Sequence, residues 1–230
     1  MDYVILDLLK KNGIKKRTRV LDVGCAFGNR VRFLNKMGYN ASGIDLGTEA
    51  IEFGKRYFGL NLQASNLEDF TSREKFDAIL MIDLIEHIRD PHVWIKKVSS
   101  LLKTNGVVIL FTPDFDCYNM YGERWGGYNM SLEHVFFYNR ESMEKIFSMY
   151  DIRLEGTVGY KSIPVVSDEV HDMSKASKIN KLSSLKRIIP NSLIDMIVDV
   201  SNRINHGKFT GNGNECSSFI VVGRNCPREW

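Results

Sequence analysis

The stretch VLDVGCAFG (Val20–Gly28) joins an apolar run, an acid and two glycines to a helical pattern that follows from Phe27. The apolar run predicts a buried strand. Glycines at such a turn let the backbone approach a ligand and expose amide groups at a helix N-terminus. The spacing D-x-G-x-x-x-G, from Asp22 to Gly28, lacks the middle glycine of the usual dinucleotide loop. The stretch therefore predicts a nucleotide-type ligand and leaves its identity open.

Strands and helices alternate along most of the chain. Apolar runs bounded by glycine predict strands, and apolar residues three and four positions apart predict helices. Strands separated in this way by helices form a parallel sheet that is covered on both faces, so we expect an α/β fold. The predicted strands are residues 19–24, 39–46, 60–65, 76–83, 106–113, 151–160 and 217–224. The first predicted helix is N-terminal, with Val4, Ile5, Leu8 and Leu9 on one side, and the second contains Phe27, Val31 and Leu34. The remaining predicted helices are residues 50–58, 94–102 and 140–150.

Two segments break this alternation. Residues 114–137 lack a regular pattern and are rich in aromatic side chains, which favours a functional loop over a disordered one. Residues 161–214 have a basic first part and then the apolar stripe of a helix, which predicts a helical insertion. We expect one domain, in which residues 1–160 and 215–230 form the core and residues 161–214 form an insertion, or lid, before the last strand.

Composition excludes several classes of protein. The chain has 230 residues, 43% of them hydrophobic, and a formal net charge of +3, which suits a globular domain and gives no general reason to expect nucleic-acid binding. Four scattered cysteines without a CxxC pair indicate neither a disulfide framework nor a zinc site. No apolar run approaches the roughly 20 residues of a membrane span, and the N-terminus lacks a signal-peptide pattern. We therefore expect a cytoplasmic protein.

Five segments follow one another in an order typical of a known enzyme family: VLDVGCAFG, GIDL, SNLEDF, FDAILMIDLIEHIRDP and LLKTNGVVILFTP. They cover about residues 19–113, and they resemble successive motifs of the class I S-adenosylmethionine-dependent methyltransferases. Thr104 and Asn105 stand where that family usually has Pro-Gly. The resemblance implies a Rossmann-like, seven-stranded, mainly parallel sheet with helices on both faces. It also implies S-adenosyl-L-methionine as the cofactor.

The resemblance assigns roles to the matching positions. The loop between the two glycines would wrap the methionine part of the cofactor, with Cys25 acting mainly through its backbone, and Asp45 would bind the ribose. Leu46 would pack on the adenine face, and Asn66 would accept a hydrogen bond from the adenine amino group, as the acid that is common there does. The implied cofactor-binding residues are Asp22, Gly24, Cys25, Ala26, Gly28, Asp45, Leu46, Asn66, Leu67, Ile82 and Asp83.

Methyl transfer to an alcohol also needs a base, and His134 is the candidate, because its side chain titrates near neutral pH. The segment EHVFFYNRESMEKIF resembles a subgroup of these methyltransferases that often acts on sugars and other small metabolites. We therefore expect a small-molecule acceptor, first an oxygen of a sugar or nucleotide-linked sugar. Nucleic acid is disfavoured, because IDLIEH replaces the pocket that such enzymes use for a flipped base. The residues expected to line the substrate are Tyr118, Tyr121, Trp125 and Tyr128.

Several alternatives stay open. His134 alternatively shapes its loop by binding a carbonyl, and Asp45 alternatively caps a helix. Asp83, Glu86 and His87 have the spacing of a cation site in quinone-pathway O-methyltransferases, but metal-free methyltransferases share this turn, so we expect no metal. A catalytically silent cofactor-binding protein, a quinone-pathway-like O-methyltransferase and an NAD-dependent oxidoreductase are the other functions considered. The basic insertion allows contact with a phosphorylated substrate or an anionic membrane surface. The sequence makes no prediction of the oligomeric state.

Overall fold

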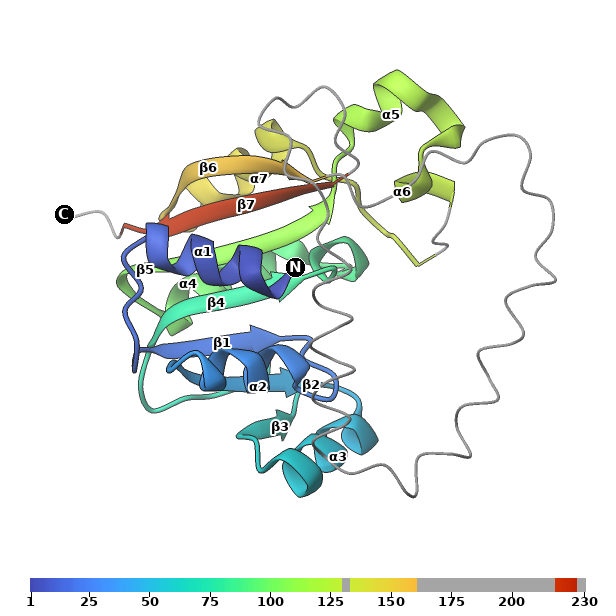
Figure 1. Ribbon diagram of the computed structural model, residues 1–230. Coiled ribbons are helices and arrows are strands. Elements are labelled where there is room, and N and C mark those ends of the chain that lie inside the picture. Colours follow the sequence, from blue (N-terminus) through green and yellow to red (C-terminus); the bar gives the residue numbers. More distant parts are fainter. Residues whose placement is uncertain (130–132, 161–217, 227–230) are drawn as a thin grey trace, which may run out of the picture.

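The computed structural model describes residues 1–129, 133–160 and 218–226 (Figure 1). The strands are β1 (Arg19–Val23), β2 (Asn40–Asp45), β3 (Leu62–Ala64), β4 (Phe76–Ile82), β5 (Leu102–Pro113), β6 (Ile152–Tyr160) and β7 (Ser218–Asn225). The longer helices are α1 (Asp2–Lys11), α2 (Asn29–Lys36), α3 (Thr48–Phe58), α4 (Pro91–Leu101) and α7 (Arg140–Ser148). Shorter helical turns are η1 (Ile85–His87), α5 (Asp116–Tyr121), η2 (Gly122–Arg124) and α6 (Gly126–Asn129).

The strands form one sheet in the order β3-β2-β1-β4-β5-β7-β6. Pairs from β3 to β5 are parallel, and β7 runs antiparallel to both of its neighbours. The predicted seven-stranded, mainly parallel sheet is therefore confirmed. The strand order reverses between β1 and β4, and in open α/β sheets ligands bind beyond the carboxyl ends of the strands at such a point.

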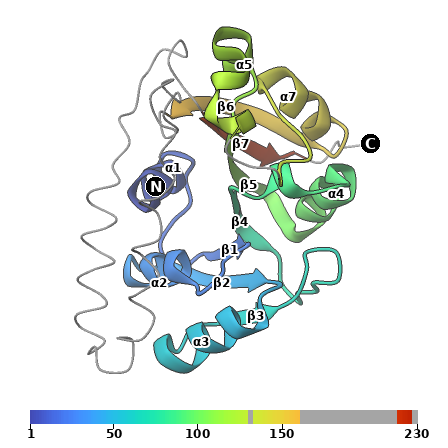
Figure 2. The same cartoon turned by 90° about the vertical axis from the view of Figure 1, so that its right-hand side faces the viewer.

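Helices cover both faces of the sheet, with α1, α2 and α3 on one side and α4 and α7 on the other (Figure 2). Alternate residues of β4 feed the two resulting cores: Ala78 and Leu80 pack with α1 and α2, whereas Ile79 and Met81 pack with α4 and α7. This alternation follows from the two-residue period of a strand. Because both cores are filled, the carboxyl edge of the sheet is the part of the fold that is left to bind a ligand.

Two helix starts that matter for the site carry side-chain caps. The Asp90 carboxylate accepts hydrogen bonds from the His92 and Val93 amides at the start of α4, and Pro91 occupies the first turn. Asn139 and Ser142 form a reciprocal capping box at the start of α7. The first cap fixes the start of α4. The second fixes the end of the segment that carries the candidate base, His134.

The structure differs from the sequence expectation in two places that border the site. Phe27 precedes α2 and is 47% exposed, because the glycine turn delays the helix until Asn29. Residues 114–137 are not a plain loop, since α5, η2 and α6 lie within them. The predicted insertion, residues 161–214, lies outside the described residues. Among the residues that are described, no helix is long and apolar enough to cross a bilayer.

Candidate cofactor and acceptor site

The loop between β1 and α2 is held in a conformation that requires glycine. Gly24 and Gly28 have φ values of 76° and 78°, in the left-handed region. A Cβ on Gly28 would also lie 2.8 Å from Leu60 and 2.9 Å from Leu62, so the turn has no room for a side chain there. Ala26, between them, has a φ of 46° and exposes its amide to Asp45. The loop is therefore sharply bent and backbone-lined, as the sequence predicts.

Asp45, at the carboxyl end of β2, fixes this loop. Its Oδ2 accepts a hydrogen bond from the Ala26 amide at 2.9 Å, and its Oδ1 accepts one from the Gly47 amide at 2.7 Å. Asp45 is not the N-cap residue of α3, as the alternative role would require, because Gly47 occupies that position. Each carboxylate oxygen keeps a further lone pair, so Asp45 remains able to accept hydrogen bonds from ligand hydroxyls.

Asp22 lies beneath the loop and is fully buried. Its Oδ1 accepts a hydrogen bond from Nη1 of Arg30 at 2.8 Å, and the Arg30 guanidinium lies 3.4 Å from Asp2 on α1. Burial raises the pKa of Asp22, and the neighbouring Arg30 works in the opposite direction. The second oxygen, Oδ2, has no hydrogen-bond partner among the described residues. A buried acceptor without a partner is costly, and a cationic ligand group would supply the missing contact.

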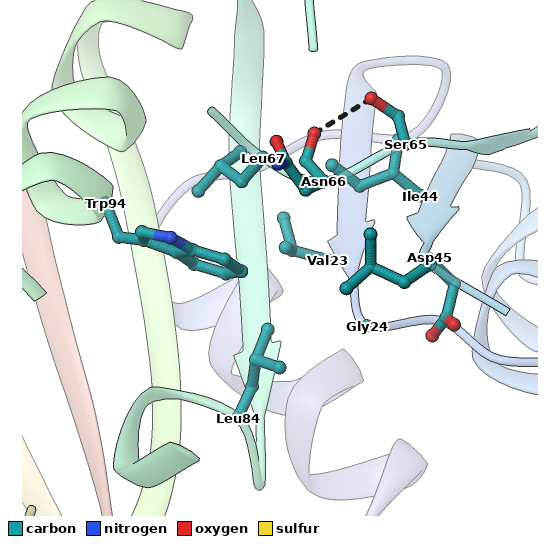
Figure 3. Close-up of a pocket in the computed structure, with 10 residues that line it drawn as sticks. Val23, Gly24, Ile44, Asp45, Ser65, Asn66, Leu67, Leu84 and Trp94 are labelled. Atoms are coloured by element: carbon teal, nitrogen blue, oxygen red, sulfur yellow. Dashed lines mark hydrogen bonds between the residues drawn. The ribbon is translucent and has the colours of Figure 1, made fainter. Parts of the chain in front are cut away.

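A pocket of about 150 Å³ opens beside the loop (Figure 3). The aromatic ring of Trp94, from α4, lies across it from the ends of β1 and β2. Most of its lining is apolar, which suits a flat ring stacked between side chains. The lining residues are Val23, Gly24, Ile44, Asp45, Leu46, Ser65, Asn66, Leu67, Leu84 and Trp94. Five residues expected to hold the cofactor thus meet in one pocket: Gly24, Asp45, Leu46, Asn66 and Leu67.

Leu46 and Asn66, both expected on the adenine side, line this pocket. Leu46 is 73% exposed at the rim, where a bound base would cover it. The Oδ1 of Asn66 already accepts a hydrogen bond from the Asp69 amide at 2.8 Å, so it closes a turn in addition to facing the pocket. Its second lone pair is what remains for an adenine amino group, and that contact stays a prediction.

The end of β4 contributes a strained residue. Asp83 is a non-glycine residue with a φ of 51°, and its amide donates to the Phe111 carbonyl at 3.0 Å. Strain of this kind persists where the surrounding structure holds it, often at functional sites. The preceding Ile82 is buried in the core, whereas the following Leu84 packs towards Gly24 and lines the pocket. Asp83 therefore lies at the edge shared by β1 and β4.

Cys25 is not a reactive thiol. Its side chain is buried against Gly43, where an added Cβ would lie 2.6 Å from the sulfur. Burial raises the pKa of the thiol to about 12, so it stays protonated at neutral pH. This agrees with the expectation that Cys25 serves mainly through its backbone.

The aromatic segment forms one packed cluster above the carboxyl edge. Phe115 and Tyr118 stack at 5.6 Å between ring centroids, and Phe137 contacts Trp125 and Tyr128 at 5.7 and 6.1 Å. Trp125 is only 1% exposed, so it supports the segment from inside and does not itself form an open substrate wall, contrary to expectation. The reason is that it packs directly against Gly127. Tyr118 and Tyr121 are half-buried and Tyr128 is exposed, so they remain available for a substrate.

His134 lies beside His87 of η1, with 4.9 Å between the ring centroids. Its Nδ1 is 2.9 Å from the carbonyl of Gly127, and Nδ1 of His87 is 3.2 Å from the carbonyl of Glu133. Burial lowers the pKa of His134, which keeps the imidazole neutral at physiological pH. His134 thus makes the contact with a backbone carbonyl that a loop-shaping role requires. That contact uses Nδ1, so Nε2 can still accept a proton.

Glu86 is the third member of the cluster that contains His87 and His134. It is buried, and its Oε2 accepts a hydrogen bond from the Thr112 hydroxyl at 3.0 Å. Burial raises the pKa of Glu86 to about 7. One carboxylate oxygen of Glu86 and one ring nitrogen each of His87 and His134 lie within 4.8 Å of one another. The cation site considered from the sequence consisted of Asp83, Glu86 and His87. In the structure His134, and not Asp83, groups with Glu86 and His87.

Sequence reasoning missed three residues of the site. Trp94 entered only as the start of a helix, and Arg30 lay unremarked on the polar side of α2. His87 was considered only for a metal. A signal existed for Arg30, since it is a cation eight positions after Asp22 and lies in the first turn of α2. Nothing in the linear sequence brings Trp94 to the adenine-side pocket, because that contact depends on how α4 packs.

Fold and site together define a nucleotide-binding α/β protein whose loop is adapted to a ligand other than a dinucleotide. A family model described as a methyltransferase domain matches residues 1–155, which is more than half of the chain. The chain therefore belongs to this family of methyltransferases, whose methyl donor is S-adenosylmethionine. The resemblance inferred from the sequence motifs is confirmed at this level.

Curated relatives match part of the chain. The chain is 32% identical over 123 residues to a ubiquinone biosynthesis O-methyltransferase of Actinobacillus pleuropneumoniae, covering 49% of this chain and 51% of that protein. It is 28% identical over 99 residues to the protein of the same name from Bradyrhizobium diazoefficiens, covering 41% and 39%. The chain thus spans about half, or less, of the length of these relatives.

Solved structures share the fold at low identity. The magnesium protoporphyrin IX methyltransferase of Synechocystis, with bound S-adenosylhomocysteine, has a TM-score of 0.60 at 12% identity, covering 97% of this chain and 81% of that one. An N-methyltransferase of Bradyrhizobium japonicum with the same ligand has a TM-score of 0.57 at 13% identity, covering 97% and 85%. These likenesses support the class I methyltransferase fold.

The residues present fit this cofactor. The unpartnered, buried Oδ2 of Asp22 suits the cationic amino group of a methionine. The carboxylate of Asp45 suits ribose hydroxyls, and the apolar pocket in front of Trp94 suits a purine ring. The chain accordingly offers a matching group for each of the three chemical parts of S-adenosylmethionine.

Proposed function

We propose that the protein transfers the methyl group of S-adenosylmethionine to an oxygen of a small-molecule acceptor, with a sugar or nucleotide-linked sugar first. The observation that carries the proposal is the imidazole of His134. Its Nδ1 is engaged by the Gly127 carbonyl, so Nε2 is the basic nitrogen. It belongs to a cluster with η1, which directly follows the end of β4 at the cofactor edge.

When bound, S-adenosylmethionine supplies an already activated methyl group. The residues of the chain then have three tasks. Asp22, Asp45 and the glycine loop hold the donor, and the aromatic segment holds the acceptor in line and excludes water. Alignment of this kind is worth up to about 7 to 11 kcal/mol of the barrier in favourable cases. Nε2 of His134 takes the proton of the attacking hydroxyl.

The proposed acceptor wall consists of Tyr118, Tyr121 and Tyr128, supported from within by Trp125. The three tyrosines present both an apolar ring and a hydroxyl, which is the mixture that a polar, partly apolar acceptor needs. His134 contacts Phe137 edge-on at 5.8 Å between ring centroids, so the proposed base is continuous with this wall. A catalytically silent cofactor-binding protein would have no need for a neutral, half-buried imidazole at this place.

A second candidate acceptor is a quinone-pathway phenol. The names of the curated relatives favour it, and their similarity to this chain is the reason for keeping it. Because roughly half of those relatives has no counterpart here, their acceptor is a weaker guide than the residues of this chain. Phenols and sugars share the need for a base near the methyl group, so His134 serves either proposal.

Transfer of isotope-labelled methyl from S-adenosylmethionine to panels of sugars, nucleotide sugars and phenols tests the function. We expect at least one panel member to gain a methyl group, and His134→Ala to lower kcat by about 10²- to 10⁴-fold, the usual worth of a general base. His92→Ala is the matched control, because His92 contacts the Tyr150 hydroxyl and does not belong to the cluster of Glu86, His87 and His134. Unchanged turnover in His134→Ala would remove His134 from the mechanism.

A further inference from the structure

A general base requires one imidazole, whereas two, those of His87 and His134, lie together in this structure. The two residues come from η1 and from the segment after the aromatic turns, so the fold brings together positions that are far apart in the sequence. A ring nitrogen of one lies within 4.8 Å of a ring nitrogen of the other. Both rings are half-buried, so neither is locked in the core.

Both imidazoles have a fixed tautomer. A backbone carbonyl only accepts hydrogen bonds, so Nδ1 of His87, at 3.2 Å from the Glu133 carbonyl, must carry the proton. The same holds for Nδ1 of His134, at 2.9 Å from the Gly127 carbonyl. In the neutral ring the remaining nitrogen, Nε2, is then an acceptor. Two rings whose centroids are 4.9 Å apart therefore each offer an acceptor nitrogen of the same kind.

The separation of the two rings is held by backbone contacts. The Glu86 carbonyl accepts hydrogen bonds from the Val135 and Phe136 amides at 2.8 and 3.2 Å, directly next to both histidines. The Glu86 side chain is anchored to β5 through Thr112. The site is thus organised before a ligand arrives, which lowers the entropic cost of binding a ligand at two points.

We propose that His87 and His134 bind two adjacent hydroxyl groups of the acceptor, one hydroxyl to each Nε2, so that the acceptor is a vicinal diol. The proposal rests on the proposed function, since His134 takes the proton of the hydroxyl that is methylated. His87 holds the neighbouring hydroxyl, which keeps its proton, and acts as a specificity-determining residue. Each hydroxyl donates at the usual hydrogen-bond length of about 2.8 Å.

The test measures binding to the full chain saturated with S-adenosylhomocysteine, without turnover. Two matched pairs serve as probes: catechol with phenol, and cis-1,2-cyclohexanediol with cyclohexanol. The nitrogen-15 resonances of the histidine rings report the tautomers, and their shifts during titration report both the dissociation constants and which Nε2 is engaged. We expect Nδ1-protonated rings and a diol that binds about tenfold more tightly, or better, than its single-hydroxyl partner.

Variants separate an acceptor contact from a structural role. In His87→Ala the preference for the diol should fall to nearly one. His87→Asn, whose amide can still donate to the Glu133 carbonyl, should behave in the same way without loosening the segment. His92→Ala should keep the full preference. Whichever of the two scaffolds shows the preference identifies the diol as aromatic or saturated.

Three results would overturn the proposal: no diol preference in either pair, an equal weakening of both pair members in His87→Ala, or a preference that a chelator removes and Zn²⁺ restores. The last would mean that a cation, and not the imidazoles, holds the diol. Failure of the proposed function looks different, because the diol preference would persist while no probe accepts a labelled methyl group.

Discussion

The Asp45 carboxylate joins the end of β2 to the glycine loop through the 2.9 Å hydrogen bond that it accepts from the Ala26 amide. The same side chain accepts from the Gly47 amide, so it fixes two backbone segments that border the cofactor pocket. A ligand hydroxyl bound to Asp45 is therefore placed relative to the loop by a single group.

Asp45→Asn should weaken binding of S-adenosylhomocysteine by about 10- to 100-fold, because a hydrogen bond to a charged group is worth roughly 1.5 to 3 kcal/mol. Calorimetric titration measures this. Glu141→Gln is the control, since Glu141 is exposed and forms an ion pair with Lys145 on α7. An affinity equal to that of the parent protein would show that Asp45 does not contact the ligand.

Gly28→Ala should destabilise the fold by more than Gly59→Ala. Both glycines have a positive φ, so both variants carry a backbone cost of about 1 kcal/mol. Only at Gly28 would the new Cβ also meet Leu60 and Leu62, whereas at Gly59 no atom of the described residues lies within 4 Å of it. Urea unfolding should give an additional loss of about 1 to 3 kcal/mol for Gly28→Ala. Equal losses would contradict the tight packing of the loop.

Arg30→Met should cost about 3 to 5 kcal/mol, because it leaves the buried Asp22 carboxylate without its cation. Burial raises the pKa of Asp22 in the folded protein. The stability that this residue contributes is therefore present below its ordinary pKa and is lost as the pH rises through the folded value. The defect of Arg30→Met should accordingly be larger at pH 8 than at pH 5.

Adding Asp22→Asn to Arg30→Met should restore part of the lost stability, since no buried charge then remains. Thermal or urea unfolding of the parent protein and of the single and double variants gives the free energies of unfolding for this double-mutant cycle. Additive losses, or a defect that is independent of pH, would show that the two side chains do not act as a pair.

Glu86 should make the stability pH-dependent. Its pKa is raised by burial from 4.5 to about 7, so its favourable contribution is complete below pH 4.5 and is lost as the pH rises through 7. The difference corresponds to roughly 3 kcal/mol. Glu86→Gln keeps an acceptor for the Thr112 hydroxyl but does not titrate, so this part of the pH profile should disappear. Parallel profiles for the two proteins would contradict the raised pKa.

The fold was largely predictable because its signals are local. The strand that ends at Val23, the turn at Gly24 and Gly28, and the acid at Asp45 all lie within one stretch, and their order is typical of one family. Phe27 was placed wrongly in the helix, because a helical spacing in the sequence does not reveal that the glycine turn occupies those positions. The short helices after Pro113 were also missed, since aromatic packing and not periodicity stabilises them.

The acceptor side was less predictable because it depends on long-range contacts. The orientation of His134 is set by the Gly127 carbonyl, and its neighbour His87 comes from a turn after β4. Trp125 has the composition expected of a substrate wall, yet its close packing against Gly127 buries it. Such outcomes follow from tertiary packing, which no spacing rule in the sequence encodes.

Calorimetric titration of the full chain with S-adenosylhomocysteine and with NAD, side by side, tests the central claim most directly. The loop lacks the middle glycine of a dinucleotide site, and the pocket is bordered by Asp45 and Trp94. The account predicts saturable binding of S-adenosylhomocysteine, lost in large part in Asp45→Asn, and no measurable binding of NAD. Binding of NAD without binding of S-adenosylhomocysteine would contradict it.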